Sequence, residues 1–428
     1  MQIVPSCHDA VASISSDQRV FVHGGAATPI PLLNALYERA SELENVELIH
    51  IHLMGDVPHN RKDFKKSFKS ANLFVGSNVR HALNYDEIDY LPCFLSEMPQ
   101  LFRQKKRPLD VALIHVSPPD RHGFCTLGTS VDIARAAVDS APTIIALINQ
   151  RMPRINGDGF IHISKIKYGI ELDFPILEEK AQTITEIERK IGKSIANLIE
   201  DGSTIQTVIG KIPNSVVAEL IHHKNLGIHT EVWSDNLLPL IESGVINNSK
   251  KTIHPGKTVS SFCIGTRKLY DFIDDNPSVV QLDIAFTNNP EIIGRNPKVV
   301  AINSAVEIDL TGQICADSVG THVISGVGGQ IDYMRGASLS KDGKAVIAIS
   351  SRTSQGKTKI VTTLKKGAGV VTTRAHTHYV ITEYGIADLY GKTLRERAKA
   401  LINIAHPDDR DELEKQWTEL ISTIVIKI

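Results

Sequence analysis

The chain of 428 residues carries an internal repeat, and this repeat is the feature that most restricts its fold. A short apolar segment precedes Gly76 in the first half and Gly265 in the second half. A second pair of similar segments contains Gly123 and Gly312, and both pairs of glycines are 189 positions apart. Equal offsets at two separate landmarks are hard to obtain by chance, so the sequence predicts a duplicated unit.

Short apolar strands and amphipathic helices alternate within each half. Residues 17–25 read as a polar turn, a strand and a glycine, and residues 201–210 have the same form. This alternation is typical of the α/β class with mostly parallel sheets. We predict two similar open α/β domains, residues 1–190 and 191–428, joined by a helical connector over residues 180–196. A ligand cleft is expected between the facing strand ends of the two domains.

Composition and charge exclude several classes of protein. The formal net charge of −1 gives no overall field that would favour nucleic acid or an anionic membrane. The sequence lacks a signal peptide pattern, and no apolar stretch approaches the ~20 residues that span a bilayer. The five cysteines are scattered without a Cys-x-x-Cys pair, which is typical of reduced thiols. We expect a cytoplasmic protein that binds neither nucleic acid nor membrane and forms a homodimer or a larger homo-oligomer.

Glu231 is the first candidate for chemistry. Residues 227–235 place its carboxylate at the end of a predicted short buried strand, where reacting groups usually lie in α/β proteins. Such a carboxylate can be an acid, a base, a metal ligand or a nucleophile, and the alternative is a helix cap or an ion pair. The first half has His52 or a neighbour at this position, so a specialised duplicate would hold the reactive group in the second half.

Two loops are candidates for binding an anionic ligand. The glycine-rich residues 325–332 can bring backbone N–H groups close to a ligand, although they match neither the dinucleotide fingerprint nor a Walker A loop. The loop from Gln206 to Gly210 precedes a helix, whose N-terminus suits a pyrophosphate or a developing thiolate. Plain turns are the alternative interpretation of both segments.

Metal chemistry and serine hydrolysis are both disfavoured. The adjacent His222 and His223 diverge on a predicted helix, and His376 and His378 alternate as on a strand. Neither pair has a cysteine or carboxylate at convincing ligand spacing, so we expect no metal. No Gly-x-Ser-x-Gly elbow is present, which argues against a Ser-His-Asp hydrolase.

Six segments together resemble the acetyl-CoA hydrolase/transferase family, and within it the 4-hydroxybutyrate (or butyrate):acetate CoA-transferases. The likeness runs over nearly the whole chain and is carried by residues 24–29, 227–231, 303–313, 325–332, 382–387 and 400–407. Each segment alone is a weak signal, but together they are highly specific. The resemblance implies two domains of related open α/β fold.

The resemblance also implies an enzyme that moves coenzyme A (CoA) between a short-chain acyl-CoA and a carboxylate such as acetate. It implies that Glu231 forms a glutamyl-CoA thioester, with ping-pong kinetics and with CoA as a substrate rather than a permanent cofactor. The residues implied in CoA contact are Gln206, Thr207, Val208, Ile209, Gly210, Val306, Gly328 and Gly329. Backbone N–H groups near Gly24 and Gly25, or near Gly328 and Gly329, are candidates for stabilising oxyanions.

Several alternatives stay open from the sequence. An acyl-CoA hydrolase would use the same Glu231 but admit water, and a non-catalytic sensor or a sugar-phosphate isomerase could share the type of fold. The acyl group is undecided among acetate, butyrate and 4-hydroxybutyrate. Glu307 is either a second catalytic carboxylate or a buried structural one, and we favour the structural interpretation.

Overall fold

The computed structural model describes residues 1–55, 64, 66–180 and 183–425, and the chain divides into two compact units. Unit 1 consists of Met1–Lys180, Thr230–Asp235 and Lys257–Asn288. Unit 2 consists of Ala181–His229, Asn236–Gly256 and Asn289–Ile428. Among the described residues, no helix combines the length and the apolar character needed to cross a membrane.

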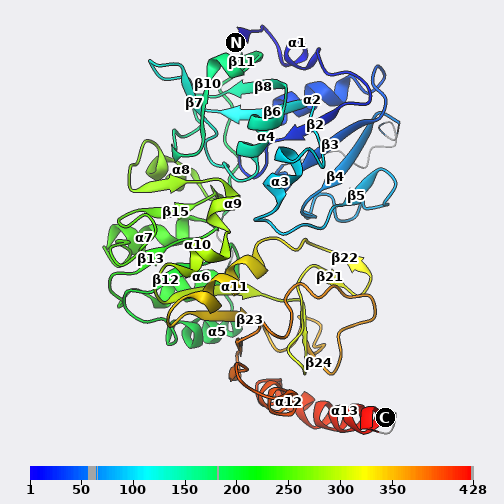
Figure 1. Cartoon of the computed structure of the whole chain (residues 1–428), viewed down its shortest axis with the longest axis vertical. Helices are drawn as coiled ribbons and strands as arrows, with labels where there is room; N and C mark the ends of the chain where they lie inside the picture. The colour runs from blue at the N-terminus through cyan, green and yellow to red at the C-terminus, as the bar shows by residue number, and fades with distance from the viewer. Residues whose placement is uncertain (56–63, 65, 181–182, 426–428) are drawn as a thin grey trace. The chain divides into compact units, whose positions relative to one another are not determined.

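Unit 1 is built on a sheet of eight strands, all of them parallel (Figure 1). In spatial order the strands are β1 (Gln2–Ile3), β11 (Tyr168–Glu171), β8 (Thr143–Ile148), β6 (Val111–Val116), β2 (Arg19–Val22), β3 (Val46–His50), β4 (Phe68–Asn72) and β5 (Ile88–Tyr90). Every residue of the central strand β6 is buried, as expected for a parallel sheet covered on both faces.

Two hydrophobic cores cover opposite faces of this sheet. Phe21 of β2 belongs to one core, with side chains of α3 (Met98–Arg103) and α4 (Ala134–Ser140). Its neighbours Val20 and Val22 belong to the other core, with side chains of α1 (Cys7–Val11) and α2 (Ile30–Glu38). Successive side chains of a strand point to opposite faces, so unit 1 is a three-layer α/β/α arrangement.

Smaller elements complete unit 1. Their strands are the antiparallel pair β7 (Phe124–Thr126) and β10 (Phe160–His162), the parallel pair β14 (Val232–Trp233) and β16 (Phe262–Cys263), and the parallel trio β15 (Thr258–Ser260), β17 (Val279–Gln281) and β9 (Asn156–Gly157). Its remaining helices are the 3₁₀ turn Ile163–Lys165, α8 (Arg267–Ile273) and α9 (Ile284–Thr287), and a 3₁₀ turn over Asp235–Leu237 leads out of it.

Unit 2 is built on a six-stranded sheet that is parallel except for its last strand. Its order is β13 (Gly227–Ile228), β12 (Thr204–Gln206), β18 (Val299–Ser304), β23 (Lys344–Ala348), β25 (Tyr379–Thr382) and the antiparallel β26 (Gly385–Asp388). The smaller sheets are β20 (Ile314–Cys315), β19 (Glu307–Asp309) and β24 (Ile360–Val361), and the pair β21 (Ser318–Val319) and β22 (His322–Val323).

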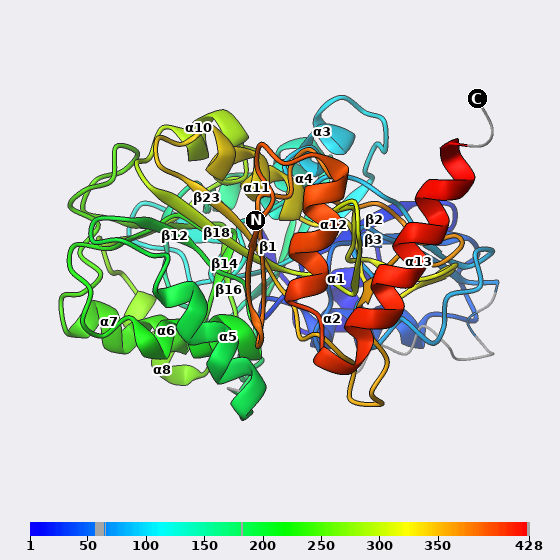
Figure 2. The same cartoon turned by 90° about the horizontal axis from the view of Figure 1, so that it is seen from below.

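Unit 2 also contains helices. They are α5 (Glu186–Ala196), α6 (Lys211–Glu219), α7 (Leu238–Glu242), α10 (Pro290–Gly294), α11 (Gln330–Leu339), α12 (Leu394–Asn403) and α13 (Pro407–Val425). Figure 2 shows α5 beside α6 and α12 beside α13, and both pairs are in contact. The predicted connector over residues 180–196 becomes the helix α5, which a Thr185–Glu188 capping box begins; residues 181 and 182 lie outside the described residues.

The two main sheets share one order of strands, which confirms the predicted duplication. In unit 1, β2 lies between β3 and β6, and β8 follows β6. In unit 2, β12 lies between β13 and β18, and β23 follows β18. The strands β2 and β12, and likewise β6 and β18, are the ones that correspond in the sequence repeat.

The division into units differs from a single boundary near residue 190. Residues 230–235 and 257–288 follow that boundary in sequence but belong to unit 1. The reason is backbone pairing: β17 adds to β9, and Phe262 forms an isolated bridge with Ser130. An ion pair between Arg103 and Asp283 joins the same parts of the chain. The candidate Glu231 is therefore part of unit 1.

Candidate active site

Glu231 occupies a bend directly before β14 and is half-buried. Its backbone carbonyl accepts two hydrogen bonds of 3.0 Å, one from the N–H of Ser261 and one from the N–H of Phe262. The following residues, Val232 and Trp233, pair with Phe262 and Cys263 in the parallel ladder of β14 and β16. On the other side of the bend, the N–H of Thr230 donates to the carbonyl of Val259 at 3.1 Å, so the backbone that carries the carboxylate is held on both sides.

Asn288 holds the side chain of Glu231. Its Nδ2 donates a hydrogen bond of 3.0 Å to Oε2 of Glu231. Asn288 is completely buried and caps the C-terminus of α9, where its N–H donates to the carbonyl of Ile284. A neutral donor on a capped helix end fixes the carboxylate in one orientation without adding a positive charge.

A second backbone segment, residues 129–132, lies against the strand that supports Glu231. The N–H groups of Val131 and Asp132 donate to the carbonyl of Ser261 at 3.0 and 3.2 Å. In return, the N–H of Cys263 donates to the carbonyl of Thr129 at 2.9 Å. Three adjacent segments of backbone therefore form one hydrogen-bonded layer beneath the candidate nucleophile.

The glycine pair that follows β2 belongs to the same unit as Glu231. A Cβ on Gly24 would lie 3.0 Å from the carbonyl oxygen of His52, so the close approach requires glycine. Gly25 has a φ of +57°, and the position of its Cβ would face Oγ of Ser130 at 3.6 Å. The N–H of Gly25 already donates to His52 at 2.7 Å, whereas the Gly24 N–H has no acceptor among the described residues. Of the two glycines, Gly24 is therefore the better candidate for an oxyanion donor.

The predicted CoA-contacting residues all lie in unit 2. Gln206 ends β12 and is fully buried, and its Oε1 accepts hydrogen bonds from the N–H of Ile302 (2.9 Å) and from Nδ2 of Asn303 (3.2 Å). These contacts bring the carboxyl ends of β12 and β18 together. The loop Thr207–Gly210 leaves from this edge, which is where ligands bind in open α/β sheets.

Two helices of unit 2 begin at predicted CoA-contacting glycines. Gly210, with a φ of +152°, is the N-cap of α6, and Gly329 is the N-cap of α11. Gly328 has a φ of +58°, a conformation that disfavours other residues. Gln330 ties the start of α11 to the end of β18, because its Nε2 donates to the carbonyl of Ser304 at 2.6 Å. Val306, which follows β18, is half-buried.

Glu307 is buried, and each of its two carboxylate oxygens has a partner on Lys365. Its Oε2 lies 2.9 Å from Nζ of Lys365, and its Oε1 accepts from the N–H of the same residue at 2.9 Å. A buried carboxylate paired in this way supports the structural interpretation of Glu307. Within the described parts of the chain, no three His, Cys, Asp or Glu side chains gather as metal ligands would.

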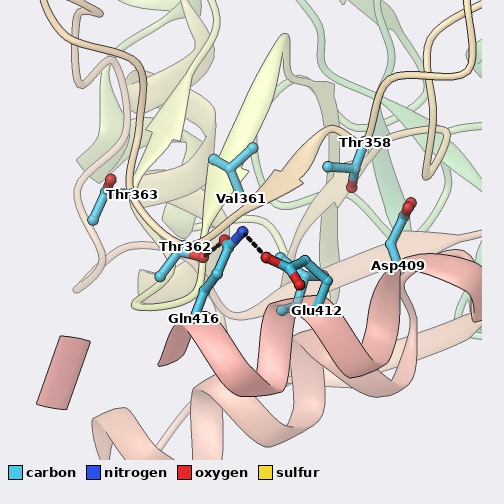
Figure 3. A pocket seen from close by; sticks show the side chains of 8 residues that line it. Thr358, Val361, Thr362, Thr363, Asp409, Glu412 and Gln416 are labelled. Carbon is cyan, nitrogen blue, oxygen red and sulfur yellow. Dashed lines mark hydrogen bonds between the residues drawn. The ribbon is translucent and has the colours of Figure 1, made fainter. Parts of the chain in front are cut away.

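A pocket of about 210 Å³ lies in unit 2 between α13 and the segment around β24. Figure 3 shows Thr358 and Thr362 facing Asp409, Glu412 and Gln416 of the helix. Gln416 bridges the two sides, accepting from Thr362 Oγ1 at 2.5 Å and donating to Glu412 at 2.7 Å. None of the residues predicted for the site lines this pocket.

Sequence reasoning missed Asn288, which contacts Glu231, and His23, which contacts the backbone segment that supports it. Asn288 lies in the sequence Asn288-Asn289-Pro290, which reads only as the end of one helix and the start of another. His23 precedes the glycine pair, and its imidazole contacts the segment over residues 129–132. Both are distant from Glu231 in sequence, and a single sequence carries no signal for such pairing.

Two domain families match this chain. The acetyl-CoA hydrolase/transferase N-terminal domain matches residues 2–177, and the corresponding C-terminal domain matches residues 265–417. The chain is 53% identical over 401 residues to the succinyl-CoA:acetate/propanoyl-CoA:succinate CoA transferase of Fasciola hepatica, covering 92% of this chain and 84% of that protein. It is 47% identical over 409 residues to the 4-hydroxybutyrate coenzyme A transferase of Clostridium kluyveri, covering 95% of each.

A solved structure agrees with these likenesses. The 4-hydroxybutyrate CoA-transferase of Porphyromonas gingivalis superimposes with a TM-score of 0.84 at 38% sequence identity, covering 98% of this chain and 97% of that one. A protein named acetyl-CoA hydrolase, from Kluyveromyces lactis, is more distant, with 34% identity covering 78% of this chain.

Proposed function

Because the chain belongs to the acetyl-CoA hydrolase/transferase family, we propose that it transfers CoA between a short-chain acyl-CoA and a carboxylate such as acetate. In this proposal Glu231 is the nucleophile and carries CoA as a glutamyl thioester. The acyl donor is 4-hydroxybutyryl-CoA, butyryl-CoA or acetyl-CoA. The relatives named CoA transferase, at 47–53% identity, support the reaction class.

The observation that carries the assignment of Glu231 is its hydrogen bond to Asn288. A nucleophilic carboxylate has to be held in one rotamer, accessible from one side and anchored by its backbone. The 3.0 Å contact from Asn288 and the two backbone bonds to the Glu231 carbonyl provide this fixation. Holding a reacting group within a narrow range of geometries lowers the activation free energy of the chemical step.

The proposed reaction begins with attack of a Glu231 carboxylate oxygen on the carbonyl carbon of the acyl-CoA. The carbon–sulfur bond breaks, which leaves an acyl-glutamyl anhydride and the CoA thiolate. The thiolate then attacks the carboxyl carbon of Glu231, the anhydride bond breaks, and the first acid leaves as its carboxylate. An incoming carboxylate reverses both steps and leaves as the new acyl-CoA, so no net proton is consumed.

Each attack passes through a tetrahedral oxyanion, and backbone N–H groups are the proposed stabilisers. The Gly24 N–H, which has no acceptor in the described part of the chain, is the candidate in unit 1. Gly328 and Gly329 are the candidates in unit 2. Losing one such donor typically costs about 10²–10³ in rate. The anhydride and the thioester are both hydrolysed by water, so the site has to exclude water during the reaction.

CoA is a substrate in this proposal, held by Gln206–Gly210, Val306 and the Gly328–Gly329 turn, and no cofactor is permanently bound. We further propose a cytoplasmic enzyme, which the five free cysteines support. The proposed assembly is a homodimer or a larger homo-oligomer. Sedimentation of the purified chain at several concentrations tests the assembly directly.

Mass spectrometry of the intact protein tests the proposal. The protein is mixed with acetyl-CoA, butyryl-CoA, 4-hydroxybutyryl-CoA or succinyl-CoA, the last because one relative is named for it. We expect the mass of CoA, less one water, to be added to the peptide that contains Glu231. An adduct on another residue, or no adduct with any donor under conditions where transfer proceeds, would contradict the mechanism.

An acyl-CoA hydrolase is the second candidate function, and the similarity to a protein named acetyl-CoA hydrolase supports it. The two functions differ in one measurement. Without an acceptor acid, a transferase forms one equivalent of adduct and stops, whereas a hydrolase releases CoA continuously. A non-catalytic sensor would bind acyl-CoA but form no adduct and release no CoA.

A further inference from the structure

His23 is buried completely between β2 and the glycine pair, and its contacts fix its tautomer. The backbone N–H of His115 donates to Nδ1 of His23 at 3.2 Å, so this nitrogen has to be unprotonated. The other nitrogen, Nε2, lies 2.5 Å from the carbonyl oxygen of Ser130. Because a carbonyl oxygen only accepts, the imidazole carries its proton on Nε2 and donates it to Ser130.

Ser130 connects the imidazole of His23 to the hydrogen-bonded backbone layer beneath Glu231. It forms an isolated antiparallel bridge with Phe262, and its neighbour Val131 donates to the carbonyl of Ser261. Ser261 and Phe262 in turn donate their N–H groups to the Glu231 carbonyl at 3.0 Å each. A continuous path of hydrogen bonds therefore runs from the imidazole of His23 to the backbone of Glu231.

The same imidazole is also coupled to the glycine pair. His23 directly precedes Gly24, and the position of a Cβ on Gly25 would face Oγ of Ser130 at 3.6 Å. Ser130 Oγ donates to the buried carboxylate of Asp132 at 2.5 Å, which orients the turn from the other side. His23 thus links the proposed oxyanion donor to the backbone that carries the proposed nucleophile.

From this geometry we propose that His23 is a positioning residue, whose Nε2–H donor to Ser130 sets the place of Glu231 relative to the Gly24 N–H. The inference rests on the proposed function of Glu231. It assigns the side chain no contact with substrate. Misplacement of a reacting group by about 1 Å can cost about 10²-fold in rate, so a single bond that fixes the backbone is large enough to matter.

Two substitutions separate the donor from the rest of the side chain. In His23→Gln, the amide nitrogen takes the place of Nε2 and can still donate to Ser130. In His23→Asn, the amide lies at the place of Nδ1 and does not reach Ser130. Asn149→Ala is the matched control, since Asn149 bonds His115 and Phe174 in the same buried layer but lies outside the path to Glu231.

The measured quantities are kcat and KM for acyl-CoA, the rate of the CoA adduct and the Tm. We expect His23→Asn to lower kcat and the adduct rate by about 10- to 100-fold with KM within about 2-fold. His23→Gln should stay within about 3-fold of the unmodified chain, and Asn149→Ala should lower the Tm while kcat stays within about 3-fold. Unchanged kcat in His23→Asn, or equal losses in both His23 variants, would overturn the inference.

One further measurement observes the tautomer of His23 in the unmodified chain and does not depend on activity. In the ¹⁵N NMR spectrum of the unmodified chain labelled at histidine, the imidazole signal that is missing from His23→Gln is assigned to His23, and it should have its proton on Nε2. A proton on Nδ1 of His23 would overturn the inference. If the unmodified chain shows neither transfer nor an adduct, the proposed function of Glu231 fails instead, and the two failures are therefore distinguishable.

Discussion

The amide nitrogen of Asn288 lies 3.0 Å from Oε2 of Glu231, although 57 positions separate the two residues in sequence. Asn288 caps a short helix, and Glu231 lies in a bend before a two-residue strand. Neither element is long enough to be stable alone, so their meeting depends on the surrounding unit. This contact defines the orientation of the proposed nucleophile and is the basis of the first two predictions.

Replacing the carboxylate of Glu231 with an amide tests its role as the nucleophile. We expect Glu231→Gln to reduce transfer to background, because loss of a catalytic nucleophile costs on the order of 10⁶ in kcat. The amide has nearly the same volume, so the Tm should change little. Glu171→Gln is the control, since Glu171 is an exposed carboxylate at the end of β11 in the same unit. Adduct formation in Glu231→Gln would contradict the assignment.

Removing the donor that orients Glu231 should slow the reaction without abolishing it. We expect Asn288→Ala to lower kcat and the rate of adduct formation by about 10²–10³, the usual cost of one well-placed donor. Asn276→Ala is the matched control, because Asn276 follows α8 in the same unit and its side chain bonds only local partners: Nδ2 donates to the carbonyl of Phe272 at 2.9 Å, and Oδ1 accepts from the N–H and the hydroxyl of Ser278. Equal losses in single-turnover experiments on both variants would mean that the effect comes from general destabilisation.

The glycine pair can be tested with a control that has the same backbone strain. Gly25 and Gly256 both have positive φ, +57° and +74°, and alanine in this conformation costs about 1–2 kcal/mol. We expect Gly25→Ala and Gly256→Ala to lower stability to urea similarly. Only Gly25→Ala should also lower kcat, because the strained residue directly follows the Gly24 N–H proposed as the oxyanion donor, whereas a Cβ on Gly256 meets nothing within 4 Å. A normal kcat in Gly25→Ala would remove this loop from the proposed oxyanion machinery.

The proposed CoA loop should affect binding more than chemistry. Gly210 caps α6 with a φ of +152°, which alanine cannot adopt without strain. We expect Gly210→Ala to raise the KM for acyl-CoA by about 10-fold or more while kcat changes less. Gly356→Ala, also at positive φ but with nothing within 4 Å of its Cβ, serves as the control. A change confined to kcat would argue that the loop acts in the reaction step.

Burial of His115 predicts a specific dependence of stability on pH. Removal from solvent lowers the pKa of His115 to about 3, and burial also lowers the pKa of His23. In the unfolded chain, both imidazoles take up protons below the ordinary histidine pKa of about 6.5. In the folded chain, they stay neutral at those pH values. The contribution of His115 to stability is therefore full above about pH 6.5 and falls as the pH decreases toward 3, by up to about 1.4 kcal/mol per pH unit, and His23 shifts stability in the same direction.

The variant His115→Gln isolates this contribution. Urea unfolding of both proteins between pH 4.5 and 7.5 should give a shallower loss of stability in the variant than in the unmodified chain. The comparison cancels the carboxylates that titrate in the same range, because both proteins contain them. Parallel curves would mean that His115 is protonated in the folded state.

The class of the fold and its duplication follow from local sequence patterns. Buried parallel strands appear as continuous apolar runs such as Val111–Val116, and their repetition in one order reveals the duplication. Glu231 could be selected because a carboxylate at a strand end stands out against its apolar neighbours. These signals are readable because each depends on residues close together in the chain.

The environment of Glu231 was decided only by the tertiary structure. Pairing of β17 with β9, and of Phe262 with Ser130, places residues 230–235 in unit 1, a result that no local pattern contains. The Asn288 donor reaches the carboxylate only through this pairing. The N–H of Gly25 is engaged by His52, a contact that follows from the pairing of β2 with β3. The sequence determined which elements form and which carboxylate is suited to react, because those depend on short-range periodicity and residue chemistry. Long-range backbone hydrogen bonds decided which donors surround that carboxylate, because their partners are specified by the packed fold and not by their separation along the chain.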